Sequence, residues 1–288
     1  MALIGAGRVA TALAVMWERA GLRVVAVTGR DATRVRAAEF LRDAPFFSWD
    51  RMPESARLAR LVVLGVPDDL IEDVCEDLAR GQAFQPEQAV LHLSGGLGLT
   101  ALASAASQGA HVLSLHPLQS FPDVETGVAR LPGSPIAVTA GEEETFAFGE
   151  GLARDAGGKP FRLADEVKPL YHAAAVFCSN YLVAVEAMAE HLFRLAGLED
   201  PLPSFHPLAR AAFDSTFALG PADALTGPAA RGDAGTIERN LVALAERAPE
   251  AIAAYVSLAR VAAGVAARSG KLNAEGEARL EEVLRRWT

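Results

Sequence analysis

The first ten residues contain the pattern that most constrains how this chain can fold. A short apolar run, Ala2–Ile4, leads into Gly5-x-Gly7-x-x-Ala10, and apolar residues then recur at helical spacing. This order predicts a β-strand, a tight turn and an α-helix. In such a turn the first glycine permits the bend, and the second lets the backbone approach a pyrophosphate. The small third residue lets the helix pack on the strand.

The turn therefore predicts a binding site for a dinucleotide. The helix that begins at Arg8 and Val9 would offer unpaired N–H groups and a partial positive charge to the phosphates. Val66 and Pro67 end another apolar run and would pass beside the ribose and nicotinamide. The alternative is a strand–turn–helix unit whose glycines serve backbone geometry alone.

The end of the second predicted strand indicates which dinucleotide is bound. NAD-preferring sites usually place an acidic residue there, bonded to the ribose 2′-OH. Here the strand Arg23–Thr28 is followed by Gly29 and Arg30, and Arg34 lies one helical turn further on. A guanidinium suits a 2′-phosphate, so we predict NADP as the cofactor. Arg34 could equally be a solvated helix charge.

Composition narrows the class of protein. A length of 288 residues favours two domains, and a net charge of −9 argues against a general nucleic-acid or anionic-membrane binder. No run of eighteen apolar residues predicts a membrane span. Cys75 and Cys178 lie far apart, which is typical of a reduced cytoplasmic protein without a disulfide or metal framework.

Polar side chains follow two further predicted strands. Ser94 comes after a run that ends in a glycine loop, and His116 comes at the end of the next run, before Pro117. Ligands of open α/β sheets bind outside the carboxyl ends of the strands. An imidazole at that place can donate to, or protonate, a substrate oxygen. The alternative for His116 is a histidine bonded to a backbone carbonyl.

The character of the chain changes near residue 164. Before it, strand-like runs alternate with helical patterns; from Asp165 onward only helical periodicity remains. We therefore predict a doubly wound parallel α/β sheet of the Rossmann type over 1–164, followed by an all-helical domain over 165–288. One long helix is expected over 166–196. His172 and Asn180 would share one face of it, either bonded within the protein or facing a substrate.

A glycine- and proline-rich loop in the second half carries further candidate residues. Thr226 and Arg231 precede a helix that begins near Thr236, and a helix N-terminus plus a guanidinium makes an anion site. The alternative is a turn in which Asp233 caps the helix and pairs with Arg231. The last helices are amphipathic, and their apolar faces could form a dimer contact.

Together these motifs resemble a known protein group. The segments are Gly5-x-Gly7-x-x-Ala10, His116-Pro-Leu-Gln-Ser-Phe121, Tyr171-His172…Ser179-Asn180 and Leu225-Thr-Gly-Pro228…Arg231-Gly-Asp233. They are similar to proteins that pair a Rossmann-like domain with domain of unknown function 2520. That group lies in the 6-phosphogluconate dehydrogenase-like clan, with ketopantoate reductases, pyrroline-5-carboxylate reductases and prephenate dehydrogenases. The resemblance implies an NADP-binding first domain, a helical second domain, an active cleft between the two domains and frequent dimerisation.

These observations predict an NADP-dependent oxidoreductase that transfers a hydride to a carbonyl or imine of a small carboxylated substrate. The resemblance makes ketopantoate the first specific candidate. His116 or His172 would act on the substrate oxygen, Asn180 and Ser94 would orient it, and Arg231 with Thr226 would bind the carboxylate. Many clan members carry a Lys-x-x-x-Asn pair on the long helix, a spacing that this chain lacks. The rival reading is a non-catalytic NADP-binding sensor or scaffold.

Overall fold

A computed structural model describes residues 1–287 of the chain. Contacts divide it into two compact units, of which the first comprises Met1–Asn180 and the second begins at Tyr181. Each unit is described by itself. The first holds every strand among the described residues, and the second is helical.

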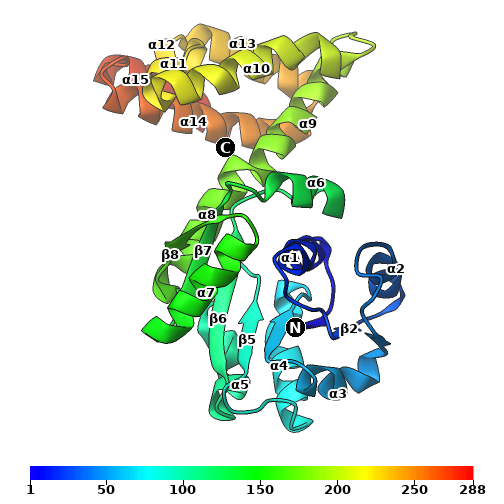
Figure 1. Cartoon of the computed structure of the whole chain (residues 1–288). Helices are drawn as coiled ribbons and strands as arrows, with labels where there is room; N and C mark the ends of the chain where they lie inside the picture. The colour runs from blue at the N-terminus through cyan, green and yellow to red at the C-terminus, as the bar shows by residue number, and fades with distance from the viewer. Residues whose placement is uncertain (288) are drawn as a thin grey trace. The chain divides into compact units, whose positions relative to one another are not determined.

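The first unit is built on one eight-stranded sheet (Figure 1). Its strand order is β3-β2-β1-β4-β5-β6-β7-β8. The first six strands pair in parallel, whereas β7 runs antiparallel to β6 and parallel to β8. The predicted doubly wound sheet is confirmed, with the correction that it is not wholly parallel. The strands are β1 (Ala2–Ile4), β2 (Ala26–Thr28), β3 (Phe46–Phe47), β4 (Leu61–Leu64), β5 (Ala89–His92), β6 (His111–Pro117), β7 (Pro135–Ala140) and β8 (Lys159–Arg162).

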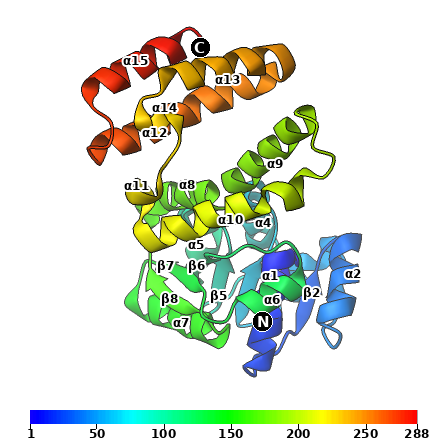
Figure 2. The ribbon, with the colours of Figure 1, turned by 90° about the horizontal axis from the view of Figure 1, so that it is seen from above.

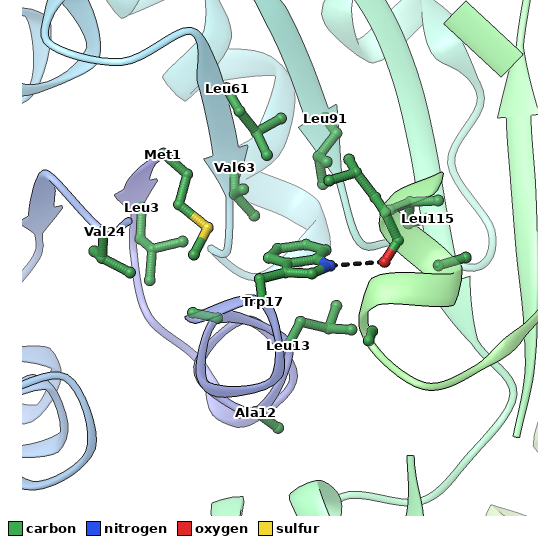
Figure 3. Close-up of a cluster of buried hydrophobic side chains, with 14 of the residues drawn as sticks. Met1, Leu3, Ala12, Leu13, Trp17, Val24, Leu61, Val63, Leu91 and Leu115 are labelled. Carbon is green, nitrogen blue, oxygen red and sulfur yellow. Dashed lines mark hydrogen bonds between the residues drawn. The ribbon is translucent and has the colours of Figure 1, made fainter. Parts of the chain in front are cut away.

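Helices cover both faces of this sheet, because each strand carries apolar side chains on both sides. On one face, Trp17 lies at the centre of the core and donates from Nε1 to the Leu152 carbonyl at 2.8 Å (Figure 3). That face is covered by α1 (Arg8–Arg19), α2 (Asp31–Phe40), α6 (Val124–Arg130) and α7 (Glu143–Asp155). The other face is covered by α3 (Met52–Arg57), α4 (Ile71–Arg80) and α5 (Ala103–Ser107).

The strand order creates a switch point between β1 and β4. After β1 the chain builds β2 and β3 on one side, then crosses back to build β4, β5 and β6 on the other. The connections on the two sides of this point diverge, which opens a crevice at the carboxyl ends of β1 and β4. Short 3-10 helices follow some strands: η1 (Trp49–Arg51), η2 (Asp68–Leu70) and η3 (Leu99–Leu102).

The predicted long helix over 166–196 is wrong. The structure has η4 (Asp165–Val167), α8 (Lys168–Cys178) and α9 (Asn180–Leu195), with a break at Ser179. The backbone of Ser179 leaves helical geometry, at φ −127° and ψ −69°. Its hydroxyl donates to the Ala175 carbonyl at 2.7 Å, a local bond of the kind that bends helices. His172 and Asn180 therefore lie on different helices and share no continuous helix face.

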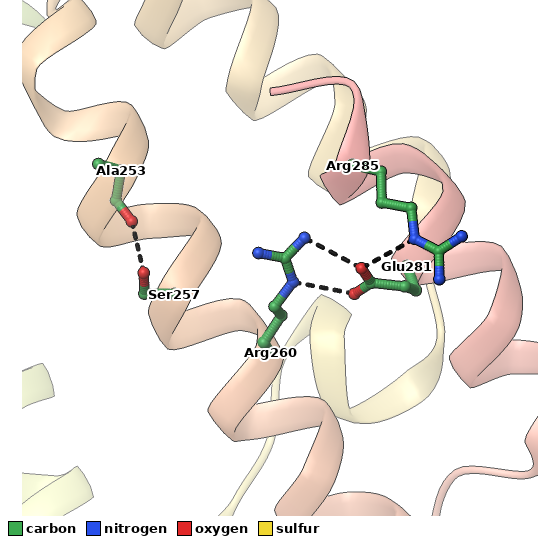
Figure 4. A network of polar contacts seen from close by, with 5 residues as sticks. All are labelled: Ala253, Ser257, Arg260, Glu281 and Arg285. Carbon is green, nitrogen blue, oxygen red and sulfur yellow. Dashed lines mark hydrogen bonds and ion pairs between the residues drawn. The ribbon is translucent and has the colours of Figure 1, made fainter. Parts of the chain in front are cut away.

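The second unit includes α13 (Ala234–Arg247), α14 (Ile252–Arg268) and α15 (Ala274–Arg285), which pack side by side (Figure 2). Its apolar core includes Ile237, Leu241, Val256 and Leu280. Arg260 of α14 makes two hydrogen bonds to Glu281 of α15, at 2.9 and 3.0 Å, and Arg285 bonds the same carboxylate (Figure 4). The bonds between the half-buried Arg260 and Glu281 tie α14 to α15. The helices after α9 are α10 (Pro201–Leu219), α11 (Pro221–Ala224), α12 (Pro228–Arg231), α13 (Ala234–Arg247), η5 (Pro249–Ala251), α14 (Ile252–Arg268) and α15 (Ala274–Arg285).

Two helical stretches are long and apolar enough to cross a membrane by length and composition alone. They span 165–195, with mean hydropathy 1.2, and 249–268, with mean hydropathy 1.4. Core helices of water-soluble proteins pass the same test, and the second stretch contributes Val256, Ala263 and Ala266 to the core of its unit. These stretches are weak evidence for a membrane span.

Candidate functional site

The glycine turn has the close packing that the sequence predicts. Gly5 has φ +77°, and a Cβ there would lie 2.7 Å from Val66 Cγ1. A Cβ on Gly65, directly after β4, would lie 2.5 Å from the Cβ of Ala10. The Gly7 N–H also donates to the Gly65 carbonyl at 3.2 Å. The small residues therefore let the turns after β1 and β4 touch.

A pocket of about 300 Å³ opens at this contact. The N-terminus of α1 faces it with Gly7 at the N-cap, and no side chain of the described residues caps the free N–H groups there. An uncapped helix N-terminus is an anion site in need of a ligand. Of the predicted cofactor residues, all but Gly5 and Arg30 line the pocket, together with residues after β4 and β5: Gly7, Arg8, Val9, Ala10, Gly65, Val66, Pro67, Asp68, Leu93 and Ser94.

The end of β2 presents arginine and no carboxylate at the first position after Gly29. Arg30 is exposed at the N-cap of α2, with its guanidinium carbon 6.0 Å from the Trp49 ring centroid. Arg34 pairs with Asp31 at 3.3 Å, and both side chains are exposed. Arg34 is thus a solvated helix charge in this structure. Arg30 is thus the cationic side chain at the end of β2, and its role toward a 2′-phosphate stays a prediction.

The sequence did not single out Arg36, which lies beside the turn over residues 5–7. This turn is called the phosphate turn below, because the sequence predicts that it binds a pyrophosphate. Its Nη1 donates to the Ala6 carbonyl at 2.6 Å, so this side chain is anchored to the turn itself. Arg36 and Arg8 line a second pocket, of about 440 Å³, between α2 and the start of α6. Nothing in the sequence around Arg36 indicated this contact.

Ser94 lies at the end of β5, as predicted, and its hydroxyl is fully engaged. It is 3% exposed, donates to Asp68 Oδ2 at 2.5 Å, and accepts from the N–H groups of Gly96 and Leu97. These bonds shape the glycine loop that follows β5. They also fix Asp68 at the rim of the 300 Å³ pocket.

Lys168 is fully buried at the start of α8. Its Nζ donates to the Ser94 carbonyl at 3.1 Å and to Ser114 Oγ at 2.8 Å. Burial lowers the pKa of Lys168 to about 8, against the opposing effect of Asp165 and Asp68. This lysine ties α8 to the carboxyl ends of β5 and β6. Pro169 marks it as a helix start, but no sequence signal indicated its burial.

His116, Tyr171 and His172 form one cluster against the loop after β5. His116 Nδ1 lies 2.9 Å from the Tyr171 hydroxyl, and the two ring centroids are 5.5 Å apart. The His172 ring centroid is 5.9 Å from that of His116. A Cβ on Gly95 would lie 2.7 Å from both His116 Nε2 and His172 Cδ2, so only glycine fits there.

Electrostatics keep the His116 ring neutral near pH 7. Burial lowers the pKa of His116 to about 4, and the neighbouring His172 and Lys168 add to this effect. Burial also raises the pKa of Tyr171 to about 12. Both side chains therefore keep their neutral forms, which can share one hydrogen bond.

The remaining predicted residues lie outside this cluster. Asn180 is exposed at the start of α9, with its Oδ1 2.9 Å from the hydroxyl oxygen of Ser179. Thr226 and Arg231 belong to the second unit and are exposed. Asp233 caps α13 by accepting from Thr236, and within residues 1–287 it makes no ion pair with Arg231.

Two buried titratable side chains of the first unit, His92 and Cys75, lie outside the candidate site. His92 is 0% exposed, and burial lowers its pKa to about 3; its Nδ1 accepts from the Ser94 N–H at 3.2 Å. Cys75 is buried with a pKa raised to about 11, and both it and Cys178 are free thiols. Residues 1–287 contain no group of three side chains placed to hold a metal ion.

The doubly wound sheet, the switch-point pocket and the glycine turn define a Rossmann-like protein. Residues 1–117 match the family model of a Rossmann-like domain. Residues 134–262 match the model of domain of unknown function DUF2520. The chain therefore carries a Rossmann-like domain followed by DUF2520, which confirms the predicted resemblance.

Solved structures share this fold over nearly the whole chain. A Bacteroides fragilis protein assigned as an NADP oxidoreductase is 24% identical, with a TM-score of 0.76, covering 91% of this chain and 97% of that one. A Thermotoga maritima protein is 21% identical, with a TM-score of 0.66 and coverage of 93% and 98%. A reductive aminase from Aspergillus terreus, in complex with NADPH and ethyl levulinate, is 19% identical, with a TM-score of 0.59 and coverage of 99% and 92%. No functionally curated protein matches the sequence.

Proposed function

We propose that this protein is an NADP-dependent oxidoreductase that transfers a hydride to a carbonyl or imine carbon of a small carboxylated substrate. The observation that carries the proposal is the pocket at the β1/β4 switch point, lined by the uncapped start of α1 and by Ser94. The similarity to a B. fragilis protein assigned as an NADP oxidoreductase and to an NADPH-bound reductive aminase supports it.

The residues present fit the cofactor. The N–H groups at the start of α1 would bind the pyrophosphate, and Gly7 leaves room for it. Arg30 would bind the 2′-phosphate, while Val66 and Pro67 would lie beside the nicotinamide end. When bound, NADPH supplies the hydride, and the protein's task is to hold the substrate carbon against the ring.

The cluster around Gly95 is the proposed substrate end of the site. His116 and His172 are the candidates for the group that acts on the substrate oxygen or nitrogen. Ser94 shapes the loop beneath them, and Lys168 holds that loop to α8. We further propose Asn180 as a contact of the substrate oxygen, and Arg231 with Thr226 as carboxylate contacts, supplied by the same subunit or by a partner copy.

The first test is a titration of the purified protein with NADPH and, separately, NADH, followed by nicotinamide fluorescence. We expect tight NADPH binding and weaker NADH binding, because Arg30 takes the place of the acid that NAD sites use. Binding of neither nucleotide would overturn the proposal. Tight NADPH binding without turnover of any tested substrate would favour the NADP sensor or scaffold.

The second test is turnover. The panel begins with ketopantoate and other small 2-keto acids and continues with ketones in the presence of amines, since similar structures include reductive aminases and imine reductases. The variants His116→Gln and His172→Gln should each lose at least tenfold in kcat. If both variants keep the wild-type rate, the assignment of the histidines is wrong.

We also propose a cytoplasmic homodimer. Large apolar side chains stand exposed on α9 and α10, including Val183 at 69%, Leu208 at 70% and Phe217 at 77%. Large apolar side chains that stand exposed in this number on two helices are often covered by a partner. Phe217→Asp should shift the mass measured by light scattering from dimer to monomer, and a monomeric wild-type protein would overturn the proposal.

A further inference from the structure

We propose that the Tyr171 hydroxyl donates its hydrogen bond to Nδ1 of His116 and thereby fixes His116 in the tautomer that carries its proton on Nε2. Tyr171 is then a positioning residue, which acts on the reaction through the histidine. The inference rests on the proposed function only for what the Nε2–H does, because the tautomer itself needs neither cofactor nor substrate.

The geometry leaves His116 with one fixed partner. Among residues 1–287 its Nδ1 is bonded to the Tyr171 hydroxyl at 2.9 Å, and Nε2 has no hydrogen bond of its own. Nε2 instead lies at the surface of Gly95, 2.7 Å from where a Cβ would be. Tyr171 is therefore the group that decides which nitrogen carries the proton.

Counting donors and acceptors favours donation by tyrosine. A neutral imidazole has one N–H and one bare nitrogen, and a phenol has one O–H. If Tyr171 donates, the bare Nδ1 gains a donor and the half-buried O–H gains an acceptor. If His116 donated from Nδ1 instead, the Tyr171 O–H would lose this acceptor and the bare Nε2 would face the Gly95 backbone. Nε2 has no partner among the described residues in either arrangement, whereas the Tyr171 O–H is paired only in the first. The first arrangement therefore leaves one fewer polar group unpaired, and buried polar groups are nearly always paired.

The charged and titratable surroundings keep the ring neutral. His172 and Lys168 of α8 and His92 of β5 face His116, and the carboxylates of Asp68 and Asp165 act electrostatically on Lys168. Burial, first of all, and then the neighbouring His172 and Lys168 lower the pKa of His116 to about 4. A ring that stays neutral between pH 6 and 8 has one proton to place, and Tyr171 places it on Nε2.

A neutral Nε2–H has a definite use in the proposed reaction. It can donate a hydrogen bond to the oxygen on which negative charge develops as hydride reaches the carbonyl carbon, without first becoming imidazolium. This makes His116 an electrophilic hydrogen-bond donor. The final proton on oxygen then comes from another group, for which His172 or water is available.

The test is long-range proton–nitrogen NMR of the full chain with ¹⁵N-labelled histidine at pH 7. Six histidines give six ring patterns, and His116→Gln identifies the pattern of His116. We expect a protonated Nε2 and a bare, hydrogen-bonded Nδ1. In Tyr171→Phe the Nδ1 signal should move toward that of a bare nitrogen without a hydrogen bond, and the ring should populate both tautomers. Tyr255→Phe is the control, since Tyr255 bonds Asn240 in the second unit.

Two results would overturn the inference: a proton on Nδ1 in the wild-type protein, or unchanged His116 signals in a folded Tyr171→Phe variant. If that variant does not fold, the wild-type tautomer decides alone. The outcome is separate from the NADPH titration. A protein that fails to bind NADPH can still show the predicted tautomer, and a protein that binds it can show the other.

Discussion

At the scale of single residues, the contact between Gly65 and Ala10 sets how closely α1 approaches the end of β4. A methyl group on Gly65 would lie 2.5 Å from Ala10 Cβ and 2.6 Å from the Gly5 carbonyl oxygen. Gly65→Ala should therefore lower the free energy of unfolding by about 1–3 kcal/mol, the usual cost of overpacking. It should also weaken NADPH binding, because the phosphate turn must move. Denaturant unfolding and the fluorescence titration measure the two effects.

The matched control is Gly151→Ala in α7, where no atom lies within 4 Å of the added methyl group. There we expect no loss, and a gain of up to about 1 kcal/mol from helix propensity. Equal stabilities of the Gly65 and Gly151 variants would contradict the packing argument.

Lys168 gives a prediction on pH. Its pKa falls from 10.5 in the unfolded chain to about 8 in the folded protein, because burial disfavours the charge. Between these values the unfolded chain holds a proton that the folded protein has released, so raising the pH favours folding. The stability of the wild type relative to Lys168→Met should therefore rise by about 3 kcal/mol between pH 7.5 and 10.5.

Urea unfolding across this pH range measures the difference, and other titrating groups cancel because both proteins carry them. The exposed Lys159 of β8 provides the control, and Lys159→Met should run parallel to the wild type. Parallel curves for Lys168→Met would mean that the lysine is not desolvated as the structure shows.

Residue roles that depend on short spacing could be predicted from the sequence, and those that depend on packing could not. The roles of Gly5 in the bend and of Ala10 in close packing follow from the sequence of one turn and the helix after it. Lys168 and Tyr171 acquire their roles only when α8 lies across the ends of β5 and β6. The helical periodicity of this segment does not indicate which side chain becomes buried when α8 packs against β5 and β6.

At the scale of elements, the start of α1 and the end of β2 should make separable contributions to cofactor binding. The pyrophosphate is common to NADPH and NADH, whereas only NADPH carries the 2′-phosphate. Arg8→Glu places a negative charge at the α1 N-terminus, so it should weaken both nucleotides at least tenfold. Arg30→Ala should weaken NADPH tenfold or more and leave NADH nearly unchanged.

Titrations of both variants with both nucleotides check this pattern. Arg34→Ala is the control for Arg30, because Arg34 is paired with Asp31 in solvent and should matter little. An equal effect of Arg30→Ala on NADPH and NADH would remove the argument for NADP selectivity.

Apolar runs predicted most strands because a buried parallel strand must be apolar on both faces. Strand β3 escaped notice because it is only two residues long, Phe46–Phe47, and half-buried. The antiparallel direction of β7 depends on how the chain is connected through the whole sheet, and the sequence of β7 alone does not indicate it. No glycine or proline marks the helix break at Ser179. The break coincides with a hydrogen bond from the Ser179 hydroxyl to the Ala175 carbonyl, which a serine in a helical pattern does not predict.

At the scale of the whole molecule, the position of the domain boundary has a testable consequence. The change from strands to helices falls near 164, but the first compact unit continues to Asn180. The added segment carries Asp165, which accepts from the Leu99 N–H at 2.9 Å, as well as Lys168 and Tyr171. These bonds reach back to the loop after β5 and to residues of β6. The segment after 164 is therefore part of the first unit's stability and of its candidate site.

A fragment of residues 1–180 should consequently unfold in one cooperative transition and bind NADPH like the full chain. A fragment of residues 1–164 loses several hydrogen bonds worth about 1 kcal/mol each and should be about 2–4 kcal/mol less stable. Circular dichroism during urea unfolding compares the two. Equal stability of the two fragments would mean that α8 does not stabilise the first unit. The hydrogen bonds from Lys168 to Ser94 and Ser114 would then form in the folded protein without contributing to its stability.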